Sequence, residues 1–224
     1  MYILSIDTAT NSGGAALARN GEVIGLAMLK TPLRYSEGIL GYVDFLLRQH
    51  ELDISQIGCF AVATGPGSFT GLRIGLATVK AFCQQLEKPV AGISTLEALA
   101  FRFRNLGGRI APMIDARRQQ IYAAVYQFEH STLSVQQPEV VVAPSDWLKH
   151  LEPGTYQFVG DGVAHCRSTI MALQPGARLL DTDNCILSEL CLLAYRQLIE
   201  GTTLSGEQIQ ANYLRPFDGA LKRP

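Results

Sequence analysis

The sequence lacks the cysteine pattern of a disulfide-stabilised or zinc-binding protein. Its five cysteines are odd in number and scattered, and no two of them form a C-x-x-C pair. Such spacing is typical of reduced thiols in a cytosolic protein, in which cysteine serves as a small apolar core residue. We therefore expect a cytoplasmic protein without structural disulfides.

Long apolar runs are also missing. Glycine, proline or a charged residue interrupts every stretch before it reaches the roughly 18 apolar residues of a membrane-spanning helix. The first seven residues have neither a basic n-region nor a long apolar core, so they predict a first strand rather than a signal peptide. The sequence predicts no membrane anchor.

An excess of charge of either sign is absent. Lysine and arginine total 19 against 20 for aspartate and glutamate, which gives a formal net charge of −1. A nearly neutral chain has no global field that could hold a polyanion. We therefore expect any contact with nucleic acid to depend on a local patch or on a partner.

Recognisable catalytic patterns are missing as well. The four histidines form neither H-x-x-x-H nor H-E-x-x-H, so a histidine-based metal site is not predicted. No G-x-S-x-G elbow is present, and no known sequence pattern joins a nucleophile to its base. The sequence predicts no catalytic residue and no metal ligand, while a pair made by folding stays open.

What the sequence does contain is a regular alternation of strands and helices. With 224 residues, 47% of them hydrophobic, the chain can bury a sizeable core. Asn20-Gly21 between two apolar runs predicts a tight hairpin turn. Apolar residues at i, i+3 and i+4 predict an amphipathic helix from Ser36, and a second helix with little charge is expected over residues 72–86. The capping box Ser94-Thr95-Leu96-Glu97 predicts the start of a third helix.

A second unit begins after a glycine-containing break. Asn105-Leu106-Gly107-Gly108 is followed by strand patterns over residues 110–114 and 121–128, and a late helix is predicted over 187–198. Two units that each open with antiparallel strands favour a duplicated core. We predict an α/β protein with one subdomain at 1–105 and a related one at 106–224, whose late helix or tail can pack back on the first.

Two segments are candidates for holding an anion or nucleotide. The first follows the first strand, where a carboxylate and hydroxyls suit a metal-bound phosphate, although a capped turn is the commoner reason for such residues. The second, residues 64–73, is a glycine-rich loop between a strand and a helix, and it meets neither nucleotide fingerprint. A tight turn that needs glycine is therefore an equal alternative. The candidate residues are Asp7, Thr8, Thr10, Gly65, Gly67, Ser68 and Thr70.

A third segment, Asp115-Ala116-Arg117-Arg118, follows the first strand of the second unit. It places two guanidinium groups beside a carboxylate. A solvated ion-pair cluster is the commoner explanation, and contact with a phosphate or with a partner's acidic face is the alternative.

Several blocks of the sequence together resemble the TsaB (YeaZ) family, and the resemblance spans nearly the whole chain. The glycine-rich block is the most specific of them. The blocks are Ile3-Leu4-Ser5-Ile6-Asp7-Thr8-Ala9-Thr10, Gly65-Pro66-Gly67-Ser68-Phe69-Thr70-Gly71-Leu72-Arg73-Ile74-Gly75, Ser94-Thr95-Leu96-Glu97-Ala98-Leu99-Ala100, Pro112-Met113-Ile114-Asp115-Ala116-Arg117-Arg118 with Ile121-Tyr122, and Tyr213-Leu214-Arg215-Pro216.

This resemblance implies an actin-like ATPase (ASKHA) fold and a role in making threonylcarbamoyladenosine in tRNA. In the family the protein is a non-catalytic scaffold for TsaD, which transfers the threonylcarbamoyl group, and it works beside TsaE, an ATPase. The resemblance also implies a homodimer when the chain is alone and contact with tRNA only through the complex. It leaves ATP or ADP at the complex open and makes no other cofactor certain.

The sequence departs from catalytic and nucleotide-binding relatives at three places. The catalytic relative has an H-x-x-x-H metal motif, and in the similar stretch of this chain the two histidine positions are Thr95 and Leu99. Neither side chain can replace imidazole as a metal ligand. Actin-like ATPases usually have glycines in the second phosphate loop and a glycine pair in the adenosine loop. The similar segments here are residues 115–118 and 160–162, which depart from that pattern, so a degenerate nucleotide cleft is expected. Tyr35 stands where many relatives have histidine, and we assign it no acid–base role.

The first two long helices are the predicted interface with TsaD or with a second copy, because the second helix carries more apolar residues than one buried stripe needs. The predicted interface residues are Leu72, Ile74, Leu76, Val79, Phe82, Ile39 and Val43. The alternative function is a stand-alone ATP hydrolase or glycoprotease-like peptidase of the same superfamily. A sugar or acetate kinase relative is disfavoured by the length and the poor second phosphate loop.

Overall fold

The computed structural model describes residues 1–30, 35–129, 132–180 and 182–215, and it contains two five-stranded mixed sheets. The first sheet has the order β3-β2-β1-β4-β5, in which β1 to β3 are antiparallel and β4 and β5 run parallel to β1. Its strands are β1 (Tyr2–Asp7), β2 (Gly13–Arg19), β3 (Glu22–Leu29), β4 (Ile57–Gly65) and β5 (Val90–Ser94). Asn20 and Gly21 adopt φ angles of 51° and 82°, which confirms the predicted hairpin turn.

The second sheet repeats this plan. Its order is β10-β9-β6-β7-β8, with β6 to β8 antiparallel and β9 and β10 parallel to β6. Its strands are β6 (Arg109–Asp115), β7 (Ile121–Glu129), β8 (Thr132–Val142), β9 (Tyr156–Val159) and β10 (Arg178–Leu180). Equal strand orders in the two halves confirm the prediction of an α/β fold built from two related units.

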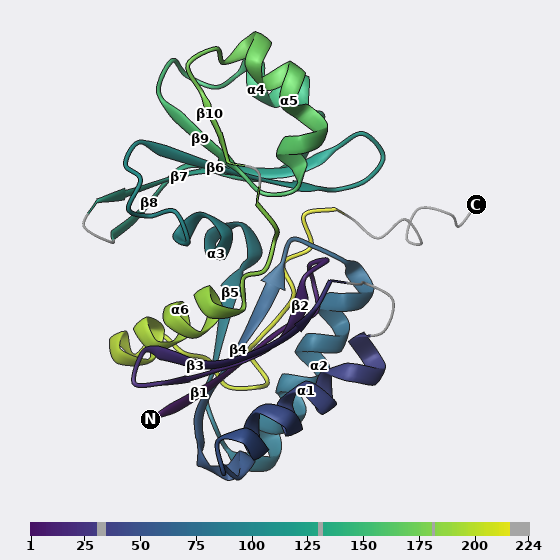
Figure 1. Cartoon of the computed structure of the whole chain (residues 1–224), viewed down its shortest axis with the longest axis vertical. Helices are drawn as coiled ribbons and strands as arrows, with labels where there is room; N and C mark the ends of the chain where they lie inside the picture. The colour runs from purple at the N-terminus through teal and green to yellow at the C-terminus, as the bar shows by residue number, and fades with distance from the viewer. Residues whose placement is uncertain (31–34, 130–131, 181, 216–224) are drawn as a thin grey trace.

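The helices form three layers around the two sheets (Figure 1). Two cover the outer face of the first sheet, two cover the outer face of the second, and two lie between the sheets. These pairs are α1 (Tyr35–Gln49) with α2 (Phe69–Leu86), α4 (Pro144–Lys149) with α5 (Gly162–Leu173), and α3 (Thr95–Phe101) with α6 (Leu187–Glu200). A short 3₁₀ helix, Ile54–Gln56, precedes β4. We call the first sheet with α1 and α2 the first lobe, and the second sheet with α4 and α5 the second lobe.

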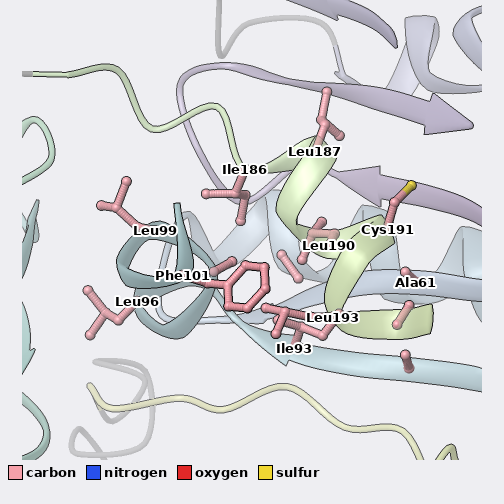
Figure 2. Packing of buried hydrophobic residues seen from close by; sticks show 14 of the residues in the cluster. Ala61, Ile93, Leu96, Leu99, Phe101, Ile186, Leu187, Leu190, Cys191 and Leu193 are labelled. Carbon is pink, nitrogen blue, oxygen red and sulfur yellow. The ribbon is translucent and has the colours of Figure 1, made fainter. Parts of the chain in front are cut away.

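The inner helices join the two lobes through a continuous apolar cluster. Figure 2 shows Phe101 of α3 lying beside Leu190 and Leu193 of α6, and these side chains are almost completely buried. Although α6 follows the second sheet in sequence, it packs against β1, β2, β4 and β5 of the first sheet. Arg102, at the end of α3, donates from Nε and Nη2 to the carboxylate of Glu189 on α6, at 3.2 Å each. The inner layer therefore holds the lobes together on one side.

All five cysteines are free thiols, and four of them are buried. Burial raises the pKa of the Cys59 thiol to about 12 and that of Cys191 to about 12, so both are neutral core residues. Within the described residues, no helix combines the length and apolar character required of a membrane span.

Candidate functional site

A cavity of about 450 Å³ lies between the lobes, where the chain leaves the C-terminal ends of β1, β4, β6 and β9. This is the edge at which open α/β sheets bind ligands. Both lobes line the cavity, and so does the segment that follows α6. The polar and aromatic lining residues are Thr10, Asn11, Ser68, Phe69, Asp115, Arg117, Tyr122, Asp161, Asn184, Asn212, Tyr213 and Arg215.

Asp7, at the end of β1, is fully buried and does not line this cavity. Its carboxylate accepts hydrogen bonds from the Ala9 amide at 2.8 Å and from the Thr10 hydroxyl at 2.5 Å. Burial raises the pKa of Asp7 to about 6, although the hydrogen bonds from Thr10 and Ala9 oppose the rise. Asp7 therefore stabilises the turn that places Thr10 at the cavity. This is the capped turn that the sequence offered as the alternative to a phosphate site.

The glycine-rich loop is pressed against this turn. A Cβ atom on Gly71 would lie 1.8 Å from the carbonyl oxygen of Thr8, and one on Gly67 would lie 2.6 Å from that of Ala9. The Thr8 hydroxyl donates to the Gly71 carbonyl at 2.6 Å. These contacts support close packing as the reason for glycine at 67 and 71.

Two amides of the loop have partners within the chain. Ser68 donates its amide to the Ala9 carbonyl at 2.8 Å, and its hydroxyl caps α2 by accepting from the Gly71 amide at 3.2 Å. Of the seven candidate residues, only Thr10, Gly67 and Ser68 line the cavity. Asp7, Thr8 and Gly65 are buried behind it, and Thr70 is exposed outside it.

The opposite wall is the turn between β6 and β7. Arg117 donates its amide and its guanidinium to the Asp115 carboxylate, at 2.8 Å and 3.2 Å. Arg117, Arg118 and Gln119 have φ angles of 61°, 53° and 60°, a left-handed conformation that costs about 1 kcal/mol or more per non-glycine residue. Arg117 and Asp115 thus form a local ion pair, as in the ion-pair cluster that the sequence suggested, and both residues line the cavity.

The chain segment after α6 also lines the cavity, although none of the predicted site residues lies in it. Asn212, Tyr213, Leu214 and Arg215 form part of the cavity wall. The ring centroids of Tyr213 and Phe69 lie 4.9 Å apart, and the Arg73 guanidinium lies 4.0 Å from the centroid of the Phe69 ring. The block 213–216 is among those that resemble the family, and that resemblance is the only sequence signal for a role of this segment.

The start of α3 carries a second polar cluster, centred on Glu139 of β8. Glu139 accepts hydrogen bonds from the Ser94 hydroxyl, and from Tyr126 and Asn212 at 2.9 Å each. Burial and the nearby Glu139 raise the pKa of Glu97. Thr95 and Leu99, on the same helix, are fully buried. Among the residues that the structure describes, no group of three His, Cys, Asp or Glu side chains is arranged to hold a metal ion.

The predicted interface residues lie mostly inside the first lobe. Five of the seven are buried: four lie in its core, because α1 and α2 turn these side chains toward their own sheet, and Leu72 lies in the inner apolar cluster at the cavity. Those five are Ile39, Val43, Leu72, Leu76 and Val79. Ile74 and Phe82 are partly buried, and the outward face of the helices carries other apolar residues, among them Leu40 and Phe45. The predicted position at Tyr35 lies outside the described side chains.

Comparison with known proteins adds a family and close structural neighbours. The family model of the tRNA N6-adenosine threonylcarbamoyltransferase TsaD matches residues 31–194. The tRNA threonylcarbamoyladenosine biosynthesis protein TsaB of Bacillus subtilis is 36% identical over 152 residues, which are 68% of this chain and 66% of that protein. The protein of the same name from Escherichia coli is 29% identical over 221 residues, covering 96% of this chain and 95% of that one.

Solved structures agree with this likeness. The structure of YeaZ from Pseudomonas aeruginosa has a TM-score of 0.77 and 26% identity, covering 95% of this chain and all of that one. An inorganic polyphosphate/ATP-glucomannokinase from Arthrobacter has a TM-score of 0.53 at 11% identity, covering 89% of this chain and 98% of that one. So low an identity shows the fold alone, and together these neighbours confirm the predicted actin-like ATPase fold.

Proposed function

Because this chain belongs to the TsaB (YeaZ) family, within the wider family that the TsaD model describes, we propose that it acts in the synthesis of N6-threonylcarbamoyladenosine in tRNA. Its role there is that of a non-catalytic subunit that makes a TsaD-like transferase competent. A TsaE-like ATPase is the third component that the family resemblance implies. The nearly neutral charge of the chain, −1, supports contact with tRNA only through the complex.

The observation that carries the non-catalytic role is the composition of α3. Thr95 and Leu99 occupy the positions at which the family resemblance places the two metal-binding histidines of the transferase. Both side chains are fully buried in the inner layer. A hydroxyl and a branched alkyl group cannot take the place of two imidazoles. A chain with this helix can support a metal-bearing partner without carrying the metal itself.

The outward face of α1 and α2 is the proposed surface for that partner or for a second copy of this chain. Leu40 and Phe45 on α1 are 57% and 52% exposed, although such large apolar side chains are usually covered. Ala77 and Ala81 on α2 are also exposed, and α1 and α2 lie side by side on the first sheet (Figure 1). We call the surface made by these four residues the helical face.

The test is reconstitution of the modification. A TsaD-like transferase, a TsaE-like ATPase, a source of threonylcarbamoyl-adenylate, ATP and tRNA are mixed with and without this chain, and the modified nucleoside is measured by mass spectrometry. We expect the product only when this chain is present. Equal product in both mixtures would contradict the proposal.

An ATP hydrolase is the second candidate, because the cavity lies at the strand ends where this class of fold binds its ligands. Against it stands Asp7, the carboxylate expected to hold a metal-bound phosphate, which is buried behind the cavity wall. The discriminating measurement is ATP turnover by the isolated protein with Mg²⁺. If the wild type turns over ATP and the folded Asp7→Ala variant does not, the chain is an enzyme and the scaffold proposal is wrong.

A further inference from the structure

The chain crosses from the first lobe to the second once more after α6. Leu204 first pairs with Val90 on β5, through hydrogen bonds of 2.9 Å and 2.8 Å between their amides and carbonyls. The following residues then run into the space between the lobes, as the yellow end of the trace in Figure 1 shows. We call residues 209–215 the strap.

The strap is held to the first lobe by buried and backbone contacts. Ile209 is 1% exposed and packs against Gly92 on β5. The amide of Asn212 donates to the carbonyl of Thr64, near the end of β4, at 2.7 Å. The ring contact between Tyr213 and Phe69 completes this attachment. Burial of an isoleucine together with a backbone hydrogen bond makes a firm anchor.

The strap is held to the second lobe by polar side chains at the cavity. Arg215 donates from Nη1 to the Ala116 carbonyl at 2.9 Å and from Nη2 to the Gln120 side chain at 2.6 Å. Asn212 donates from Nδ2 to Glu139 at 2.9 Å. Such partly exposed hydrogen bonds exchange with water at a small net cost, so this end of the strap is the weaker one.

Arg215 bridges both ends of the left-handed β6–β7 turn. The Ala116 amide donates to the Gln120 carbonyl, and the Gln120 amide donates to the Arg117 carbonyl, at 3.0 Å each. Three successive non-glycine residues with positive φ make this turn unfavourable on its own. Since Arg215 contacts Ala116 and Gln120 together, its release frees the end of the strap beyond Tyr213 and loosens the turn in one step.

We propose that the strap is a latch for the cavity between the lobes, hinged on the first lobe and released at Arg215. Leu214 and Arg215 form part of the cavity wall, so their movement away from the second lobe opens it, while Asn212 and Tyr213 stay on the first lobe. On the far side the lobes are joined by the apolar inner layer of α3 and α6, which stays in place. This inference follows from the contacts of the strap and does not rest on the proposed function.

The test compares hydrogen exchange of the full-length wild type, Arg215→Ala and Arg167→Ala. Arg167 is exposed on α5 and serves as the matched control. We expect Arg215→Ala to accelerate exchange of the Ala116 and Gln120 amides by about tenfold or more, because one charge-assisted hydrogen bond is worth about tenfold and Arg215 makes two of them. The Asn212 amide, which is bonded to the first lobe, is expected to keep the wild-type rate.

Opening itself is followed by hydroxyl-radical labelling of the cavity-lining Tyr122, with the buried Tyr156 as the internal reference. Labelling of Tyr122 is expected to rise in Arg215→Ala and to stay unchanged in Arg167→Ala. Gln120→Ala, which removes one acceptor of Arg215, is the second variant in case Arg215→Ala fails to fold. If the Asn212 amide exchanges faster by the same factor as the Ala116 amide, the whole strap detaches and the latch proposal is wrong. Unchanged exchange rates in both Arg215→Ala and Gln120→Ala would also overturn it.

Discussion

Asp7 is a carboxylate that the fold buries at a cost. Because its pKa rises from 3.8 to about 6, the folded protein keeps a proton on Asp7 at pH values at which the unfolded chain has lost it. Folding takes up a proton in that interval, so the contribution of Asp7 to stability is complete below about pH 3.8 and is lost as the pH rises through 6.

The Asp7→Asn variant removes this titration. At about pH 7 we expect it to be more stable than the wild type by about 1–3 kcal/mol, since the neutral amide avoids burying a charge. Near pH 4 the difference is expected to disappear. Urea unfolding at both pH values measures this, with Asp44→Asn on the exposed face of α1 as the control. A constant difference at both pH values would contradict the burial of a charge at Asp7.

Gly71 tests whether the glycine loop is built for packing. Because a Cβ atom there would lie 1.8 Å from the Thr8 carbonyl oxygen, Gly71→Ala must displace backbone. We expect a loss of about 3 kcal/mol or more in the free energy of unfolding. Gly41→Ala is the matched control on α1, where the added methyl group meets open space, and it is expected to stabilise the helix by about 0.5–1 kcal/mol. Near-equal stability of the two variants would contradict the packing role.

The helical face of α1 and α2 is where the sequence pattern and the structure differ most in detail. A 3.6-residue period identifies the apolar stripe of a helix, but it does not say whether the stripe meets its own sheet or a partner. Val79 and Leu76 therefore belong to the core, while Leu40, which shares the helical spacing of the buried Val43, is exposed together with Phe45. Sequence alone could not separate the two sets, because the difference depends on the orientation of the helices on the sheet.

Phe45→Glu is the element-scale test of this surface. We expect it to abolish association with a TsaD-like transferase, or with a second copy, because a charge at the centre of an apolar contact is left without a partner. Its melting temperature is expected to stay unchanged, since Phe45 is half exposed. Val135→Glu is the matched control, an equally exposed apolar residue on β8. Sedimentation velocity with the transferase distinguishes them, and wild-type association of Phe45→Glu would reject the helical face.

Other elements show what local patterns can and cannot reveal. The β1 to β3 meander was predictable because Asn20-Gly21 defines a hairpin turn by local chemistry alone. The helix α5 was missed, since its apolar residues Val163, Cys166 and Ile170 are interrupted by polar ones and no side chain caps it. The strand β8 was also missed, because Pro138 and neighbouring polar residues hide its alternation.

At the scale of the whole molecule, two sheets of equal strand order enclose an inner helical layer and leave a cavity at the opposite edge. The duplicated plan could be predicted, because strand-led patterns recur along the sequence. The cavity wall could not, because Arg215 meets Ala116 and Asn212 meets Thr64 across long sequence separations. Contacts of this kind follow from the packed fold rather than from any local period.

The central claim is that this chain makes a TsaD-like transferase competent through its helical face. The most direct measurement is the yield of N6-threonylcarbamoyladenosine in tRNA, by mass spectrometry, in the reconstituted mixture supplied with wild-type chain, Phe45→Glu or Val135→Glu. We predict full yield with the wild type and with Val135→Glu, and a yield with Phe45→Glu as low as that without the chain. Full yield with Phe45→Glu, or full yield without any chain, would contradict the account.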